Sequence, residues 1–211
     1  KKILKKYKRK KYLAKLIFVK PQKYKKIKSR IKNNYLNSQA NEENMSFVFA
    51  VSKVLKISEK SFIRSLKSFK GLPHRYEIFL KKKNLIFIND SKATSFQSTK
   101  FALQSNKNIF WILGGLPKLG DKFNIGKLKK NIVKTYIIGK HMNNFKKLLS
   151  KKVNYKLVGS LKNAVPLIFK DLQKVRNKKI TILFSPASAS YDQFKNFEER
   201  GNKFKNLIKK Y

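Results

Sequence analysis

The spacing of apolar residues changes near residue 71 of this 211-residue chain. Before that point, apolar side chains recur every three or four positions in 41–56 and 58–69, which predicts two helices. After it, short apolar runs of strand length alternate with stretches of helical spacing. Such alternation with short connections is typical of a mostly parallel sheet with helices on both faces. We therefore expect a helical segment, 1–70, followed by an α/β domain, 71–211.

The two helices of the first segment should pair as a hairpin. Asn41 and Ser58 suit the N-cap positions, and Gly71 and Pro73 would end the second helix. The expected apolar faces comprise Met45, Val48, Phe49, Val54 and Leu55 in the first helix and Phe62, Ile63, Leu66 and Phe69 in the second. Upstream, the apolar island at 16–19 predicts a short strand.

The α/β domain should begin with a β-hairpin, because 76–80 and 85–88 are strand-like and separated by Lys-Lys-Lys-Asn. Further strands are predicted at 109–113, 135–138, 155–158 and 180–184. Helices are predicted near 97–105, 124–131, 142–150, 160–174 and 193–209.

Composition adds an extreme positive charge to this picture. The chain has 53 Lys and Arg against 10 Asp and Glu, a formal net charge of +43. Clustered cations bind nucleic-acid phosphates by releasing counterions, so one interpretation is a basic α/β nucleic-acid-binding module. The lysines occur in every segment rather than in one stripe, which favours a general compositional drift and only non-specific nucleic-acid binding.

The chain has no cysteine, which excludes disulfides and thiolate metal sites and fits a reducing compartment. No apolar run approaches the roughly 20 residues of a membrane span. The basic first stretch has too short an apolar part for a signal peptide. We therefore expect a cytoplasmic protein without a membrane partner. The first residue is Lys1 rather than methionine, which suggests a piece of a longer chain.

Three loops that follow predicted strands are rich in small and polar residues. They are Asn-Asp-Ser-Lys-Ala-Thr-Ser (89–95), Gly-Gly-Leu-Pro-Lys-Leu-Gly-Asp-Lys (114–122) and Ser-Pro-Ala-Ser-Ala-Ser (185–190). Ligands of open α/β sheets bind beyond the carboxyl ends of strands, where hydroxyls and helix-start N–H groups favour anions. We therefore expect the loops to meet and form a pocket for carboxylates or phosphates. Taken singly, each loop has a simpler explanation as a helix cap.

Other familiar motifs for catalysis or metal binding are not present in the sequence. The stretch 115–122 differs from a phosphate-binding loop, since Asp121 stands where the motif's lysine should follow glycine. No dinucleotide-binding glycine pattern occurs, and no nucleophile–base pair can be read from the sequence. With only His74 and His141, we expect no histidine metal cluster.

Four stretches resemble, in this order and spacing, the carboxyl-terminal domain of the D-glutamate-adding branch of the Mur ligase family, which acts in peptidoglycan synthesis. They are Gly-Leu-Pro-His-Arg-Tyr-Glu (71–77), Phe-Ile-Asn-Asp-Ser-Lys-Ala-Thr (87–94), Trp-Ile-Leu-Gly-Gly with Lys118 (111–118), and the run from Ser185 to Phe204. Residues 37–44 resemble the end of the family's central ATPase domain. The resemblance implies a Rossmann-like sheet for 71–211 and makes 1–70 a remnant of the central domain.

The resemblance also implies a reaction. The family uses ATP and Mg²⁺ to convert the terminal carboxylate of UDP-N-acetylmuramoyl-L-alanine to an acyl phosphate, which the amine of D-glutamate attacks to form an amide. The matching positions imply that D-glutamate is held by Thr94, Lys118, Ser190 and the backbone at Phe197. They imply ATP contacts from Asn41, Asn44, Arg75, Asp90 and Lys92, with His74 and Lys92 as catalytic residues.

The chain also departs from the family pattern. Ser38 and Ala40 replace the family's Gly and His before Asn41, and Ser95 stands where Asn is usual. The uridine-nucleotide domain, phosphate loop, magnesium ligands and carbamylated lysine have no counterpart in the sequence. We therefore expect no metal ligands here, an amino-terminal part that binds Mg²⁺ and most of UDP-N-acetylmuramoyl-L-alanine, and a monomeric fragment that is inactive alone. A non-catalytic binding remnant is a further alternative.

Overall fold

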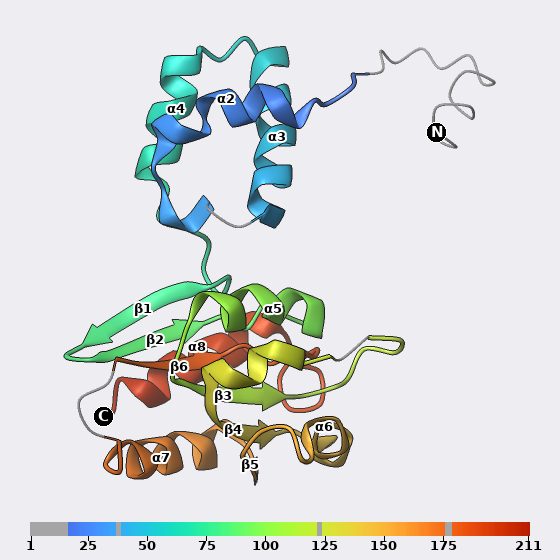
Figure 1. Ribbon diagram of the computed structural model, residues 1–211, viewed down its shortest axis with the longest axis vertical. Helices are drawn as coiled ribbons and strands as arrows, with labels where there is room; N and C mark the ends of the chain where they lie inside the picture. Colours follow the sequence, from blue (N-terminus) through green and yellow to red (C-terminus); the bar gives the residue numbers. More distant parts are fainter. Residues whose placement is uncertain (1–16, 37–38, 122–123, 176–178) are drawn as a thin grey trace. The chain divides into compact units, whose positions relative to one another are not determined.

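A computed structural model describes residues 17–36, 39–121, 124–175 and 179–211 (Figure 1). The chain divides into two compact units, Lys1–Lys70 and Gly71–Tyr211. Each unit has an apolar core of its own.

The first unit is helical in its described part. Its elements are α2 (Pro21–Ile31), the 3₁₀ turn η1 (Asn34–Leu36), α3 (Gln39–Val54) and α4 (Glu59–Ser68). As predicted, Ser58 caps α4, since its side chain accepts a hydrogen bond from the Ser61 N–H. Helix α2 was not predicted, and the strand predicted at 16–19 is wrong, because 17–19 have no regular structure. Leu16 lies outside the described residues.

Helix α3 differs from its prediction in its start and in its burial. It begins at Gln39, so Asn41 lies in its first turn rather than at the N-cap. Phe49 is buried in the core of this unit, and Met45 packs against that core. Val54 and Leu55, expected on the same buried face, are 58% and 65% exposed. The spacing therefore predicts the helix but not the extent of its burial.

The second unit is built on a six-stranded sheet with the strand order β1-β2-β6-β3-β4-β5. The strands are β1 (Glu77–Lys82), β2 (Leu85–Asn89), β3 (Ile109–Gly114), β4 (Ile132–Ile138), β5 (Tyr155–Gly159) and β6 (Ile180–Phe184). β1 and β2 form an antiparallel hairpin, and the pairs from β2 to β5 are parallel. The predicted mostly parallel sheet is confirmed.

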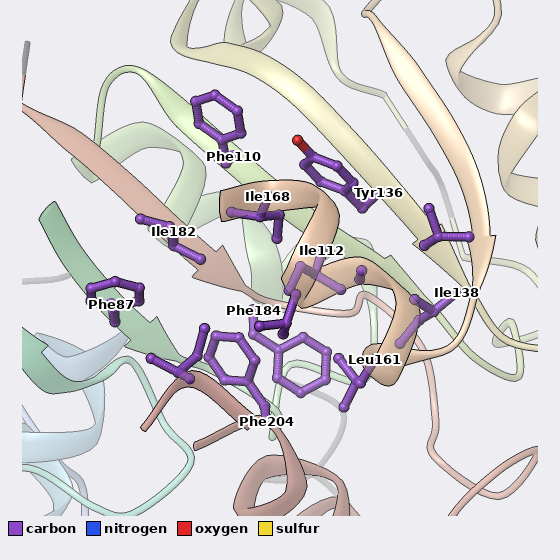
Figure 2. Packing of buried hydrophobic residues seen from close by; sticks show 14 of the residues in the cluster. Phe87, Phe110, Ile112, Tyr136, Ile138, Leu161, Ile168, Ile182, Phe184 and Phe204 are labelled. Atoms are coloured by element: carbon purple, nitrogen blue, oxygen red, sulfur yellow. The ribbon is translucent and has the colours of Figure 1, made fainter. Parts of the chain in front are cut away.

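Helices cover the sheet on both faces. They are α5 (Phe96–Ser105), the 3₁₀ segment η2 (Gly126–Asn131), α6 (Met142–Leu149), α7 (Leu161–Leu172) and α8 (Phe197–Ile208). On one face, Ile168 of α7 and Phe204 of α8 pack with Phe184 of β6 (Figure 2). On the other, Leu103 of α5 and Phe145 of α6 belong to the second cluster. The helix predicted at 193–209 begins only at Phe197, where Asn196 is the N-cap. The one predicted at 124–131 is a 3₁₀ segment.

Candidate functional site

The three polar loops meet at one edge of the sheet. Strand β6 lies between β2 and β3 and is parallel to both, so the loops that follow these strands leave on the same side. Backbone hydrogen bonds join them: Gly114 N–H donates to the Pro186 carbonyl at 3.0 Å. Leu116 and Ala189 also exchange a pair of bonds, each 3.0 Å long. The predicted convergence of the loops is confirmed.

Asp90 joins the end of β2 to the end of β6. Its carboxylate is buried, and it accepts hydrogen bonds from Ser185 Oγ at 2.7 Å and from the Tyr76 N–H at 2.9 Å. Burial raises the pKa of Asp90 to about 7, against the opposing effects of these two bonds and of the Arg75 charge. The carboxylate therefore faces partners within the protein, and its contact with ATP stays a prediction.

His74 lies in a buried polar cluster at the start of the hairpin. Its Nδ1 is 2.9 Å from Asn89 Nδ2, and because an amide nitrogen only donates, Nδ1 accepts and the ring proton lies on Nε2. Asn89 also donates to Glu77 Oε2, while Lys205 Nζ binds Glu77 Oε1 at 2.9 Å. Burial and the charge of Lys205 lower the pKa of His74. A Cβ at Gly201 would lie 2.2 Å from His74 Nδ1, so glycine is required there.

Lys92, Phe197 and His74, which come from three separate segments, lie together. The Lys92 ammonium is 3.6 Å from the centroid of the Phe197 ring, a cation–π contact that holds the charge in place. The His74 ring meets the same phenyl ring edge-on, with centroids 6.0 Å apart. The Lys92 N–H donates to the His74 carbonyl at 2.9 Å. The two residues expected to be catalytic are therefore neighbours.

The other predicted residues of this unit lie in or beside the same loops. Thr94 is half-buried and precedes Ser95, the N-cap of α5. Ser190 is 3% exposed, and its carbonyl accepts from the Phe194 N–H. Lys118 and Arg75 are exposed at their side chains. Their ligands stay predictions.

The predicted asparagines belong to α3 in the first unit. Asn41 is half-buried and donates to the Tyr35 carbonyl at 2.7 Å, and Asn44 is exposed. The expectation that these residues share an ATP site with the second unit stays a prediction.

Sequence reasoning missed Arg200, the most buried charged residue of the site. It is 1% exposed, and its guanidinium donates to the Ser91 carbonyl at 2.8 Å and to the Ser188 carbonyl at 3.0 Å. Its Nε also donates to Ser91 Oγ at 3.1 Å. The signal was present, because Arg200 falls three positions after Phe197 and four before Phe204, on the apolar face of α8.

Two further features of the described residues bear on function. No three His, Asp or Glu side chains among them are grouped so that they could hold a metal ion. None of the helices in those same ranges is both long and apolar enough to cross a membrane.

Comparison with known proteins shows which enzymes the chain resembles. No family model matches the chain. The UDP-N-acetylmuramoylalanine--D-glutamate ligase of Wolbachia sp. subsp. Brugia malayi is 42% identical over 175 residues, which cover 83% of this chain and 35% of that ligase. The ligase of the same name from Rickettsia felis is 36% identical over 179 residues, covering 85% of this chain and 40% of its own length. Over more than four fifths of its length, the chain is therefore similar to ligases of the Mur family.

The similarity covers only part of each relative. The chain spans 35% and 40% of the lengths of these two ligases. Solved structures agree on the fold: a crystal structure of MurF from Acinetobacter baumannii aligns with 82% of the chain at a TM-score of 0.58 and 17% identity. A bifunctional folylpolyglutamate synthase/dihydrofolate synthase from Yersinia pestis aligns at 0.51 and 12% identity. The Mur ligase fold expected from the sequence is thus confirmed.

Proposed function

We propose that this chain forms the D-glutamate-binding part of a peptidoglycan ligase that adds D-glutamate to UDP-N-acetylmuramoyl-L-alanine. The observation that carries the proposal is the meeting of the loops after β2, β3 and β6 at one sheet edge. Those loops and the start of α8 carry Thr94, Lys118, Ser190 and Phe197. The names of the relatives supply the substrates.

The chemistry of D-glutamate suits these groups. Its two carboxylates need cations, hydroxyls or backbone N–H donors, which Lys118, Thr94 and Ser190 would supply. Phe197 is the first residue of α8, so its N–H has no acceptor within the helix, and such N–H groups at a helix start favour anions. Held in this way, the amino acid would present its amine to the second substrate.

In the proposed reaction, the lone pair of the D-glutamate amine attacks the acyl carbon of an acyl phosphate. A C–N bond forms, the C–O bond to phosphate breaks, phosphate leaves with the electron pair, and the amine releases a proton to solvent. ATP supplies the phosphoryl group. His74, with its proton on Nε2, would act as a hydrogen-bond donor beside Lys92. The cation–π contact with Phe197 would help to hold the Lys92 ammonium, which would face a phosphate.

ATP would lie against Arg75, Asp90 and Lys92 of this unit. The residues described do not fit a Mg²⁺ ion, because no group of three candidate ligands occurs among them. We therefore assign the magnesium ligands to the part of the relatives that this chain does not cover, and no step here depends on the metal.

The rival nucleic-acid function would use exposed aromatic rings on which the bases of a single strand stack. Phe87, Phe110, Phe184 and Phe204 are buried in the core (Figure 2). The exposed rings of Phe18, Phe47, Tyr191 and Tyr211 come from separate stretches of the sequence, which gives this alternative less support than the ligase.

The first test is a titration of the full chain with D-glutamate, followed by backbone amide NMR. We expect shifts at Thr94, Ser190 and Phe197 with D-glutamate and none with L-glutamate. Lys118→Ala should weaken binding by roughly ten- to a hundred-fold, since an ammonium–carboxylate bond contributes about 1.5–3 kcal/mol. Lys203→Ala removes an exposed charge from α8 and is the matched control. Equal shifts with both enantiomers, or unchanged binding in Lys118→Ala, would contradict the proposal.

A second measurement separates the two half-sites. The chain is joined to the amino-terminal part of the Wolbachia relative, and phosphate release is followed with each substrate varied. Lys118→Ala should raise the KM for D-glutamate, whereas Arg75→Ala and Lys92→Ala should raise the KM for ATP. If Lys118→Ala raises only the KM for ATP, the assignment of the half-sites is wrong.

A further inference from the structure

Arg200 carries a buried charge without an acidic partner. Its side chain is 1% exposed, yet none of the ion pairs formed within the described ranges involves it. Its Nη1 is buried and has no hydrogen-bond partner. Burial lowers the pKa of the guanidinium to about 10, against the opposing charge of Asp192, so the group is still cationic at neutral pH. Burying an unpaired charge is costly, which calls for a functional reason.

The hydrogen bonds of Arg200 fix two peptide groups of the loops. The first joins Ser91 to Lys92: its carbonyl accepts from Arg200 Nη2 at 2.8 Å, and its N–H donates to the His74 carbonyl at 2.9 Å. The second joins Ser188 to Ala189: its carbonyl accepts from the same nitrogen at 3.0 Å, and its N–H donates to the Leu116 carbonyl at 3.0 Å. Each peptide plane is thus held at both ends.

Arg200 also acts on the start of its own helix through Ser91. Its Nε donates to Ser91 Oγ at 3.1 Å, and that hydroxyl donates to the Phe197 carbonyl at 2.8 Å. The loop after β3 packs close to the same guanidinium, because a Cβ at Gly115 would lie 3.1 Å from Nη1. One side chain therefore contacts or approaches the loops after β2, β3 and β6.

We propose that Arg200 is a positioning residue for the dicarboxylate site, holding the loops that carry Lys92, Ser190 and Phe197 and adding a positive charge that forms no ion pair with a carboxylate of the described residues. The identity of the ligand in this inference rests on the proposed function, whereas the positioning role of Arg200 does not. The fixed peptide planes set the direction of Lys92 and the path of the chain into Ser190. The unpaired charge favours an anion over a neutral ligand at the same loops.

The test compares Arg200→Met, Arg200→Lys and the control Lys203→Met, an exposed position on the same helix. In the full chain, amide hydrogen exchange is measured at Lys92 and Ala189, together with D-glutamate affinity. In both Arg200 variants we expect these two amides to exchange about ten-fold faster or more, while the Ile182 amide in β6 is unchanged. D-glutamate affinity should fall about ten-fold in Arg200→Met. It should fall less in Arg200→Lys, which keeps the charge but loses the planar set of N–H donors of the guanidinium.

Three results would overturn the inference. One is unchanged exchange at Lys92 and Ala189 in Arg200→Met, and another is full recovery of exchange and affinity in Arg200→Lys. If Arg200→Met does not fold, Ser91→Ala decides, since it removes only the hydroxyl relay to Phe197. We expect Ser91→Ala to bind D-glutamate several-fold more weakly than the wild-type chain does. The third contradicting result would be wild-type affinity in Ser91→Ala. If the wild-type chain does not bind D-glutamate at all, the proposed function fails, and the exchange rates still decide the positioning role.

Discussion

The two units bury their apolar side chains to different extents. In the second unit, every residue of β3 is buried, and apolar clusters lie on both faces of the sheet. In the first unit, α3 leaves Phe47, Val51 and Val54 more than half exposed, at 62%, 56% and 58%. Helical spacing of apolar residues is present in both units, so spacing alone does not decide burial. A helix buries its apolar face only where a second apolar surface packs against it.

This contrast should give the two units different stabilities, and the fluorescence of one residue can measure the stability of the second unit. A unit of about 70 residues buries a smaller fraction of its surface than one twice that size, so its stability is more marginal. Trp111, the one tryptophan in the sequence, is fully buried in the second unit and donates to the Ser185 carbonyl at 2.8 Å. Its fluorescence therefore follows unfolding of the second unit by itself.

The largest expected effect comes from truncating the core of the second unit. Phe204→Ala removes a fully buried ring that packs against Phe184 and Phe79, and should lower the free energy of unfolding by about 3–5 kcal/mol. Denaturant unfolding monitored by Trp111 fluorescence measures it. Phe62→Ala makes a similar cavity in the first unit and should leave that transition in place. A shift of the Trp111 transition by both variants would show that the two units unfold as one.

A smaller effect should come from pH, which should change the stability of the second unit through Asp90 but not that of the first unit. The pKa of Asp90 is raised by burial to about 7 in the folded state from an ordinary value of 3.8. The folded state therefore favours the protonated carboxyl, and this contribution is complete below about pH 4 and lost as the pH rises toward 7.

Asp90→Asn imitates the protonated carboxyl, so the variant should not lose this contribution. Relative to the variant, the wild-type protein should lose stability on the order of 3 kcal/mol between pH 4.5 and 7.5. Trp111-monitored unfolding at the two pH values measures the difference, and other titrating groups cancel because both proteins carry them. The helical signals of the first unit should not respond to the substitution. A constant difference across this pH range would show that Asp90 is ionised normally in the folded protein.

The smallest effects should come from two matched helix caps. Ser58 caps α4 in the first unit, and Asn196 caps α8 in the second, each by accepting a hydrogen bond from a backbone N–H. Replacing either with alanine should cost about 1 kcal/mol. Only Asn196→Ala should move the Trp111 transition, whereas Ser58→Ala should appear in amide exchange of α4. If Ser58→Ala also moves the Trp111 transition, the first unit contributes to the stability of the second.

The sequence predicted the second unit better than the first for a physical reason. Strands buried on both faces, such as β3 and β6, are continuous apolar runs and can be recognised locally. Helix α2 was missed because lysines surround its three buried residues, Tyr24, Ile27 and Ile31. The apolar run at 17–19 imitates a strand, but the described residues there have no neighbouring strand to pair with.

In the candidate site, too, some features could be predicted from the sequence and others could not. The polar loops could be predicted because each follows a strand, and parallel strands end at one edge. The pairing of Glu77 with Lys205 could not, since the two residues are separated by 128 positions and meet only through the topology. In a chain with 53 basic residues, nothing in the sequence marks which lysine has a partner.

The place of β6 has a consequence for how the protein is made. This strand follows β1 to β5 in the sequence, yet it pairs with both β2 and β3. While a ribosome extends the nascent chain, β2 and β3 each keep one edge without its partner until residues 180–184 emerge. Such edges pair readily with other chains, and contacts between distant segments form slowly. The segment that closes the sheet is followed directly by Ser190, Phe197 and Arg200. Completion of the sheet and assembly of the loops proposed to bind D-glutamate are therefore expected together, after the strands β1 to β5 have been synthesised.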